Sequence, residues 1–440
     1  MQRDLINTLP EKVGQSVTVY GFVQVRRDHG KIIFLDILDR SGTVQVVISP
    51  GVNLDHLPGA QDAICVTGMV NKRPENLINK NLPTGEIELA VQSLEILSKA
   101  QELPFDMGGK DLDLQLPTLL DFRALTLRHP KIKKIFKVQE MVVEGFKRAA
   151  QKLDCTEIFT PTISYSSTEG GAEVFKVKYY EHEAFLVQSP QIYKQIAVGA
   201  FERVYLISHA YRSEPSITTR HLSESIQMDC ELGFMEFEDL LDALELVGRA
   251  VVEYVVKTYP DILEEFGVDQ PKINPEIPRL KMREAQEIIR ERTGRESNEP
   301  DLSPEDEREI CRWALEEKNS DFVTITHYPT KKRAFYSMPD PQNPEYSLSY
   351  DLLFKGVEIL SGSQRIHDLG KLEEVMKERG MDPKNFEMYL QAFKFGMPSH
   401  GGFSFGLERM TMQILGLANI REASLFPRDM ERIDIRLSKT

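Results

Sequence analysis

The chain has 440 residues, which is enough for roughly two or three domains. Its hydrophobic fraction of 41% and charged fraction of 28% are ordinary for a globular protein. The net charge of −14 excludes a general nucleic-acid coat, although a local basic patch could still bind RNA. No apolar run approaches the length of a membrane span, so we expect no membrane association. The 4 cysteines are scattered without a metal-binding spacing, which favours a reduced, cytoplasmic protein.

The first 103 residues are predicted to form a small β-barrel. Apolar alternation predicts about five short strands, at 16–25, 32–38, 44–48, 63–70 and 87–97, and this number is typical of an oligonucleotide-binding (OB) fold. Arg26, Phe34 and Gln45 are candidate nucleic-acid contacts. An arginine binds phosphate, an exposed aromatic ring stacks on a base, and an amide reads a base edge. The alternative is that Phe34 belongs to the core, and Arg26 and Arg27 to a solvated edge.

The rest of the chain is predicted to be a linker and a larger α+β domain. Residues 104–125 lack clear periodicity and read as a hinge, and 126–440 form the second domain. Helical spacing of apolar residues predicts amphipathic helices over 132–153 and 237–258, and a strand over 157–160 ends at Pro161. Residues at about 260–330 carry little obvious chemistry, so we expect a peripheral helical insertion there.

A charged hairpin between Tyr211 and Glu231 is the strongest candidate site. Alternation places Arg212 and Glu214 on one face of the first strand, and Asp229 and Glu231 on one face of the second. Arg212 and, in the loop, Arg220 lie beside these carboxylates, and such a mixture of charges suits a ligand that carries both a phosphate and an ammonium group. The alternative is a salt-bridged face that only meets solvent.

Further candidates lie on both sides of this hairpin. Ser189 is placed to cap a helix that carries Gln191 and Lys194 on one face, where a lysine either reaches solvent or balances an anionic ligand. Glu169 lies in a glycine-containing loop that is either a turn or a mobile lid.

The last two candidates follow in the C-terminal third. Asp351 and Glu358 flank a hairpin turn and could hold Mg²⁺ on a nucleotide, and Arg365 nearby suits a carboxylate. The glycine-rich strand ending at Gly406 leads into a helix with Arg409, an arrangement that favours phosphate.

In this order, three of these stretches resemble the signature motifs of class II aminoacyl-tRNA synthetases. They are the helix and strand that end at Pro161, the hairpin with Arg212, and Gly406-Leu-Glu-Arg409. Three further stretches resemble the aspartyl enzymes in particular. They are Thr168-Glu-Gly-Gly171, Gln188-Ser-Pro-Gln-Ile-Tyr-Lys-Gln195, and Asn419-Ile-Arg-Glu-Ala with Leu-Phe-Pro-Arg428. The resemblance covers nearly the whole chain. It implies an antiparallel catalytic sheet flanked by helices, following an anticodon-binding OB-fold, and a homodimer that uses residues 132–161.

The resemblance also implies a role for each candidate residue. The expected substrates are L-aspartate, ATP and tRNA(Asp), with Mg²⁺ as the cofactor. Catalysis is assigned to Arg212, Glu358 and Arg409. Aspartate binding falls to Glu169, Ser189, Gln191, Lys194, Arg212, Asp229, Ser361 and Arg365. ATP binding falls to Arg212, Glu214, Arg220, His221, Leu222, Glu358, Gly406 and Arg409, metal binding to Asp351, Glu358 and Ser361, and anticodon contact to Arg26, Phe34, Gln45 and Glu88. Lys194→Leu is expected to abolish aspartate activation and to leave the fold intact.

Several alternatives stay open at this point. Ser225 and Ile226 stand where many members of the family carry an aromatic residue that stacks on adenine. Gln24 and Pro83 leave undecided whether tRNA(Asn) is charged as well as tRNA(Asp). Competing functions are an asparaginyl-tRNA synthetase, a tRNA-independent synthetase paralogue and a non-catalytic RNA-binding protein.

Overall fold

The computed structural model describes residues 3–165, 173–215, 218–296 and 300–437, and the chain forms two compact units. The units comprise residues 1–115 and 116–440. Each is described by itself below. The hinge expected at 104–125 has no regular structure before residue 116, and it then runs into two short helices, α1 (Leu116–Asp121) and the start of α2 (Arg123–Thr126).

The first unit is a closed five-stranded barrel with strand order β1-β2-β3-β5-β4, which confirms the predicted OB-fold. Its strands are β1 (Ser16–His29), β2 (Ile32–Leu38), β3 (Thr43–Ile48), β4 (Ala63–Lys72) and β5 (Ile87–Ser98). Alternate residues such as Val17, Val19, Leu35 and Ile37 point inward and are fully or almost fully buried. The alternation seen in the sequence is therefore the inside–outside pattern of the barrel wall.

The second unit is built on an eight-stranded sheet with the order β12-β13-β14-β15-β16-β11-β10-β6. From β13 to β10 every neighbouring pair is antiparallel, as predicted, whereas both edge strands, β12 and β6, pair in parallel. The strands are β6 (Thr156–Glu157), β10 (Arg203–Tyr211), β11 (Glu224–Gly233), β12 (Arg279–Lys281), β13 (Phe322–Thr326), β14 (Ser349–Phe354), β15 (Val357–Gln364) and β16 (His400–Gly406).

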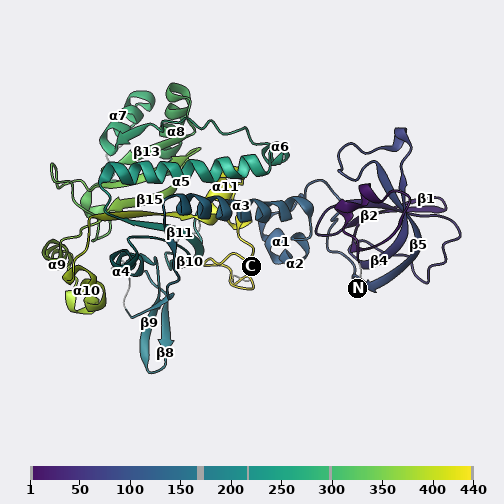
Figure 1. Cartoon of the computed structure of the whole chain (residues 1–440), viewed down its shortest axis with the longest axis horizontal. Coiled ribbons are helices and arrows are strands. Elements are labelled where there is room, and N and C mark those ends of the chain that lie inside the picture. Colours follow the sequence, from purple (N-terminus) through teal and green to yellow (C-terminus); the bar gives the residue numbers. More distant parts are fainter. Residues whose placement is uncertain (1–2, 166–172, 216–217, 297–299, 438–440) are drawn as a thin grey trace. The chain divides into compact units, whose positions relative to one another are not determined.

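Two long amphipathic helices pack against each other and against this sheet (Figure 1). They are α3 (Pro130–Lys152) and α5 (Phe237–Thr258), and both match the sequence prediction closely. Their apolar faces are buried: Val138, Val142 and Phe146 on α3 and Leu244 and Val251 on α5 are inaccessible to solvent. This burial of one face is what the 3.6-residue spacing of apolar side chains requires.

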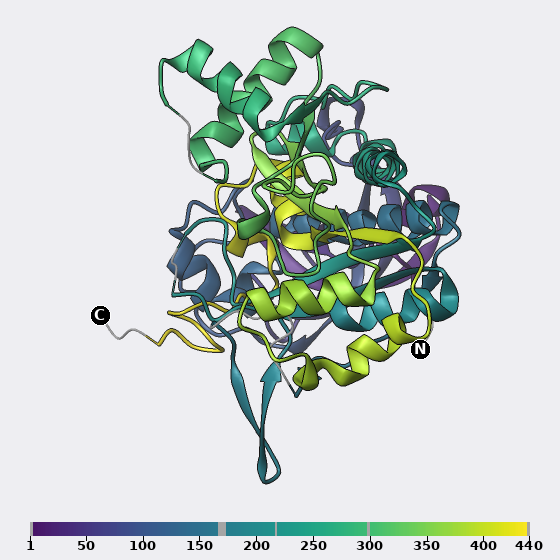
Figure 2. The ribbon, with the colours of Figure 1, turned by 90° about the vertical axis from the view of Figure 1, so that its left-hand side faces the viewer.

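Shorter elements complete the second unit. Helices α4 (Gln191–Phe201), α9 (Leu369–Glu378), α10 (Glu387–Lys394) and α11 (Leu407–Leu415) surround the sheet. Strands β7 (Ile163–Ser164), β8 (Lys176–Tyr179) and β9 (His182–Leu186) form a small separate sheet, and its β8–β9 hairpin projects away from the rest of the unit (Figure 2). No helix among the described residues has both the length and the apolarity needed to cross a membrane.

The segment expected to be a helical insertion is more than a peripheral scaffold. It contains α6 (Ile262–Phe266), α7 (Met282–Thr293) and α8 (Pro304–Lys318). It also supplies β12 and β13, which form one end of the main sheet. The expectation failed because β13 is a short apolar run, which periodicity alone does not distinguish from part of a buried helix.

Candidate active site

The hairpin predicted from the sequence is formed by β10 and β11, which pair antiparallel from Arg203↔Leu232 to Tyr211↔Glu224. One detail of the prediction was wrong. Strand β10 ends at Tyr211, so Arg212 and Glu214 lie in the loop that follows it rather than on its face. The second strand behaves as predicted, because Asp229 and Glu231 alternate along β11 and both contact the lysine of α4.

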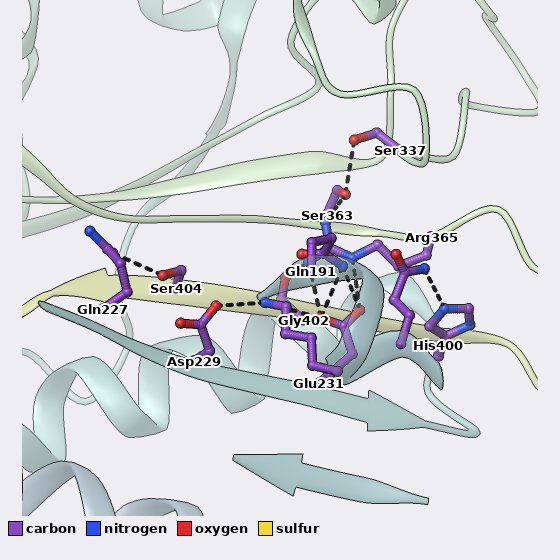
Figure 3. Close-up of polar contacts among 12 residues, drawn as sticks. Gln191, Gln227, Asp229, Glu231, Ser337, Ser363, Arg365, His400, Gly402 and Ser404 are labelled. Atoms are coloured by element: carbon purple, nitrogen blue, oxygen red, sulfur yellow. Dashed lines mark hydrogen bonds and ion pairs between the residues drawn. The ribbon is translucent and has the colours of Figure 1, made fainter. Parts of the chain in front are cut away.

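Four charged side chains, Lys194, Asp229, Glu231 and Arg365, form a buried group that we call the inner cluster. Lys194 Nζ lies 2.8 Å from Asp229 Oδ1 and 3.3 Å from Glu231 Oε2. Arg365 Nε lies 2.8 Å from Glu231 Oε1 (Figure 3). Every one of these side chains is at most 5% exposed. Two cations and two carboxylates balance each other, as burial of charge requires.

Glu231 lies at the centre of the inner cluster. Besides the two cations, Gln191 Nε2 approaches its carboxylate at 3.4 Å (Figure 3). Burial acts to raise the pKa of Glu231, but Arg365 and Lys194 outweigh it and lower that pKa to about 2. Gly402 on β16 faces the same carboxylate, and a Cβ there would lie only 2.2 Å from Glu231 Oε2. The glycine is therefore required by the close approach of the carboxylate to the strand.

Asp229 has an unmet hydrogen-bonding capacity. Burial raises its pKa, although Lys194 opposes the shift. Its Oδ2 is buried and has no hydrogen-bond partner among the described residues. The nearby Ser404 hydroxyl donates to Gln227 Oε1 instead, at 3.0 Å (Figure 3). A buried acceptor without a partner is costly, so this oxygen is suited to receive a donor from a ligand.

A series of hydrogen bonds beside the inner cluster links Tyr389, Gln195 and His400. Tyr389 donates its hydroxyl to Gln195 Oε1 at 3.1 Å, and Gln195 Nε2 lies 2.9 Å from His400 Nε2. His400 Nδ1 lies 2.9 Å from the Pro398 carbonyl, so the ring carries its proton on Nδ1. Burial lowers the pKa of His400 to about 4, and the ring stays neutral beside Arg365.

A second group, Arg212, Arg220, His221 and Arg409, lies nearer to solvent, and we call it the outer cluster. Arg212 is exposed, and the side chains of Arg220 and Arg409 are 19% and 25% exposed. Burial lowers the pKa of His221, and the positive charges of Arg409, Arg212 and Arg220 lower it further, while Glu214 acts in the opposite direction. Three guanidinium groups around one imidazole form a site for a polyanion.

Lys194 and Arg365 of the inner cluster and all four residues of the outer cluster line one cavity of about 490 Å³. It brings together most of the residues singled out from the sequence: Ser189, Gln191, Lys194, Arg212, Arg220, His221, Leu222, Glu358, Ser361, Arg365, Gly406 and Arg409. Ser189 does not cap α4 as predicted, because the residue in the capping position is Pro190. Glu214 lines a small adjoining recess. Asp229 does not line the cavity itself but pairs with Lys194, which does. Glu169 falls outside the described residues.

The candidate metal ligands lie at one side of this cavity, on β14 and β15. Asp351 and Ser361 are paired across the two strands, and a residue that the sequence analysis did not single out, Arg333, contacts both. Its Nη2 lies 2.5 Å from Asp351 Oδ2 and its Nη1 donates to Ser361 Oγ at 3.0 Å. Arg333 also stacks on the buried Tyr328 ring, with 3.8 Å between the guanidinium carbon and the ring centroid.

Asp351 and Glu358 fit a divalent cation whose coordination is completed by oxygen atoms of a bound ligand. Asp351 Oδ1 is buried and unpartnered in the part of the chain that the structure describes. Desolvation and, after it, the Asp351 carboxylate raise the pKa of Glu358 to about 7, while Arg409 and Arg333 oppose the shift. The described residues contain no group of three His, Cys, Asp or Glu side chains that could hold a metal alone. Oxygen atoms from a phosphate and from water would therefore have to complete the coordination of Mg²⁺.

On the barrel, the side chains predicted to contact nucleic acid do not all contact one another. Phe34 is half-buried on the outer surface, paired with Arg27 across β1 and β2. Gln45 Nε2 donates to Glu88 Oε2 at 3.2 Å on neighbouring strands. Arg26 instead donates to Asp28 and to the Pro58 carbonyl, at 2.8 Å and 3.2 Å. Arg27, the neighbour of Arg26 in the sequence, therefore shares a face with Phe34.

Comparison with known families agrees with this architecture. Residues 115–430 match the family model described as tRNA synthetases class II (D, K and N), and residues 17–97 match an OB-fold nucleic-acid-binding domain. The chain belongs to the class II tRNA synthetases. The resemblance seen in the sequence motifs is thereby confirmed.

Individual relatives of this class II synthetase match over almost their whole length. An aspartate–tRNA(Asp/Asn) ligase of Thermus thermophilus is 42% identical, covering 98% of this chain and 99% of the relative. An aspartate–tRNA(Asp) ligase of Pyrococcus abyssi is 38% identical, covering 96% of each. Among solved structures, asparaginyl-tRNA synthetase of Pyrococcus horikoshii complexed with asparaginyl-adenylate has a TM-score of 0.89 at 31% identity, covering 98% of this chain and 99% of that one.

Sequence reasoning assigned no site role to three charged residues near the cavity of this synthetase. Strand alternation placed Glu231 on the same face as Asp229, but no role was given to it. Glu307 comes from the first turn of α8 and Arg333 from the stretch between β13 and β14, and no motif marked either of them. Only the pairing of distant segments in the fold brings these two side chains to the site.

Proposed function

We propose that this protein is an aspartate–tRNA ligase, which activates L-aspartate with ATP and transfers it to the 3′ end of tRNA. The inner cluster is the observation that carries the proposal. Arg365 uses four of its five N–H donors within the protein, and Lys194 uses two of its three. Each cation keeps one donor for a ligand, and both line the cavity. Together they suit the side-chain carboxylate of aspartate.

The inner cluster also offers a hydrogen-bond acceptor for the α-ammonium group of aspartate. The unpartnered Asp229 Oδ2 is the acceptor for the α-ammonium group. Asparagine is nearly isosteric with aspartate but carries an NH₂ group in place of one carboxylate oxygen, so its binding would leave one of the two remaining donors of Lys194 and Arg365 facing another donor. A loss of this kind is worth roughly 10⁴-fold in selectivity. This argues against the asparaginyl alternative.

In the first step, the aspartate α-carboxylate attacks the α-phosphorus of ATP in line. A P–O bond forms to the carboxylate as the P–O bond to the β-phosphate breaks, which gives aspartyl-adenylate and pyrophosphate. Positioning and charge neutralisation do most of the work in such a displacement. Arg212 meets the α-phosphate, while Arg220, His221 and Arg409 hold the other phosphates. Magnesium bound at Asp351, Glu358 and Ser361 would supply further positive charge to the phosphates of ATP.

In the second step, a ribose hydroxyl at the 3′ end of tRNA attacks the carbonyl carbon of the adenylate and releases AMP. The outer surface of the barrel, with Phe34, Gln45, Glu88 and Arg26, is proposed to contact the anticodon. The proposed acceptor is tRNA(Asp). A second acceptor, tRNA(Asn), is favoured by the name of the Thermus thermophilus relative.

A homodimer is part of the proposal. Phe159 is 89% exposed in the stretch between β6 and β7 that the family resemblance assigns to the subunit interface. An apolar ring at that exposure is suited to burial against a second copy. Sedimentation equilibrium should then give about twice the chain mass of 50.3 kDa, and an active monomer would contradict the dimer.

The function is tested by pyrophosphate exchange and tRNA charging. Exchange should require ATP and aspartate, and asparagine should not replace aspartate. Charging with purified tRNA(Asp) and tRNA(Asn) then decides between the two acceptors. Exchange that depends on asparagine would overturn the proposal, and exchange without charging of either tRNA would indicate a tRNA-independent paralogue.

A further inference from the structure

The first turn of α8 carries a carboxylate, Glu307, that reaches the outer cluster from the segment expected to be peripheral. The start of this helix is firmly fixed. Ser303 caps it by accepting the Asp306 N–H at 3.2 Å, and Pro304 occupies the first helical position. The Ser303 hydroxyl also donates to Asp306 Oδ2 at 2.8 Å. Glu307 therefore extends from a rigid point of the fold.

Glu307 joins the hairpin loop to strand β15. Its Oε2 lies 2.8 Å from Arg220 Nη1 and accepts the Glu358 N–H at 3.4 Å. The Glu307 and Arg220 side chains are 14% and 19% exposed, so this pair is partly shielded from solvent. Burial raises the pKa of Glu307, while Arg220 lowers it. A partly buried, charge-assisted hydrogen bond is stronger than a surface ion pair.

Other contacts hold the loop by its backbone rather than by the guanidinium. Arg421 Nη1 donates to the Thr218 carbonyl at 2.9 Å, and the Ile420 N–H donates to the Thr219 carbonyl at 2.9 Å. These contacts place the loop over the cavity but leave the long Arg220 side chain free to rotate. Among the described residues, the Glu307 carboxylate is the partner that fixes the direction of that side chain.

We propose that Glu307 is a positioning residue for ATP, which holds Arg220 beside the phosphates through the ion pair. The inference rests on the proposed function, in which Arg220 binds the polyphosphate of ATP. An arginine has five N–H donors, and Glu307 engages one of them. The others stay free for phosphate oxygens, and a guanidinium already held in place loses less conformational entropy when ATP binds.

The test is a double-mutant cycle with Glu307→Gln, Arg220→Gln and the combined variant, assayed by aspartate-dependent pyrophosphate exchange. Glu307→Gln should raise KM for ATP about tenfold, the size expected when a charge-assisted hydrogen bond is lost. KM for aspartate should change by less than about twofold, because the inner cluster is untouched. In the Arg220→Gln background, Glu307→Gln should have little further effect, since the pair acts as one unit.

Glu305→Gln is the matched control, because Glu305 lies in the same helical turn but is 66% exposed and pairs with Arg295. It should leave KM for ATP unchanged. Glu307→Asp keeps the charge but shortens the side chain by one methylene, so it should raise KM for ATP by a smaller factor. It serves as the test should Glu307→Gln not fold.

Two results would overturn the inference while the proposed function stands. One is that Arg220→Gln raises KM for ATP but the Glu307 variants leave it unchanged or lower it. The other is that the two substitutions have additive effects. If the unmodified protein shows no aspartate-dependent exchange, it is the proposed function that fails.

Discussion

The inner and outer clusters both contribute cationic side chains to the same cavity, yet their environments differ. In the inner cluster each cation is paired with a carboxylate at 2.8 Å, and exposure does not exceed 5%. In the outer cluster Arg220 pairs with Glu307 at 2.8 Å, but Arg409 is 3.4 Å from the Glu358 side chain and Arg212 is exposed. Burial and full pairing give the inner cluster one rigid arrangement, which suits discrimination between small amino acids. Partial exposure lets the outer cluster adapt to a flexible triphosphate.

The largest effect is expected from Lys194→Leu in the inner cluster. It removes one of two cations from the proposed aspartate pocket, so kcat/KM for aspartate in pyrophosphate exchange should fall by about 10³-fold or more. The structure changes one part of the expectation drawn from the sequence. Lys194 also balances the buried Asp229 carboxylate, so its loss should destabilise the fold by about 3–5 kcal/mol.

Lys194→Leu combined with Asp229→Leu provides the control for that prediction. Removing both partners should recover part of the stability, measured by chemical denaturation, but none of the activity. Aspartate-dependent exchange that survives in folded Lys194→Leu protein would exclude Lys194 from the pocket.

The next largest effect is expected from Arg409→Gln in the outer cluster. It removes a cation from the proposed phosphate site, so kcat/KM for ATP should fall by about 10²-fold. Stability should change by less than about 1 kcal/mol, because the Arg409 side chain is 25% exposed and only weakly paired. Steady-state kinetics and thermal unfolding measure the two quantities. A loss of stability as large as that of Lys194→Leu would contradict the distinction between the clusters.

The free energy of unfolding, measured as the pH is lowered, tests the charge of the inner cluster. The folded-state pKa of Glu231 is lowered to about 2, from an ordinary value of 4.5. Its charge therefore stabilises the fold above pH 4.5, and this contribution is lost as the pH falls from 4.5 toward 2. Glu231→Gln should make the free energy of unfolding less dependent on pH in this window, by a few kcal/mol in total.

Glu305→Gln serves as the exposed control in that titration, and its profile should follow that of the unmodified protein. An unchanged slope for Glu231→Gln, measured by urea denaturation at each pH, would show that the inner cluster does not hold the carboxylate ionised. The raised pKa of Asp229 acts in the opposite direction, so the comparison has to be made between variants at the same pH.

The sequence predicted the elements and residues that follow a regular period, and it failed where only tertiary contacts decide. Helix α5 begins and ends where its apolar spacing does, and strand alternation placed Asp229 and Glu231 on one face. The end of β10 at Tyr211 was missed, because Arg212 and Glu214 continue the alternation of the strand up to Pro215. Arg333 reaches Asp351 across 18 residues of irregular chain, a pairing that no local pattern encodes.

The smallest effect is expected from ionic strength, and it tests both clusters without substitution. Screening acts on exposed charges and much less on buried ones, because the Debye length falls from roughly 10 Å at 0.1 M salt to roughly 3 Å at 1 M. Raising the concentration of an inert salt over that range, at constant free Mg²⁺, should therefore raise KM for ATP by about threefold to tenfold. KM for aspartate should rise by less than about twofold, since its proposed ligands are at most 5% exposed. Equal rises in the two KM values would mean that the amino-acid site is as open to solvent as the phosphate site, and the rigid inner cluster would then not be the source of selectivity.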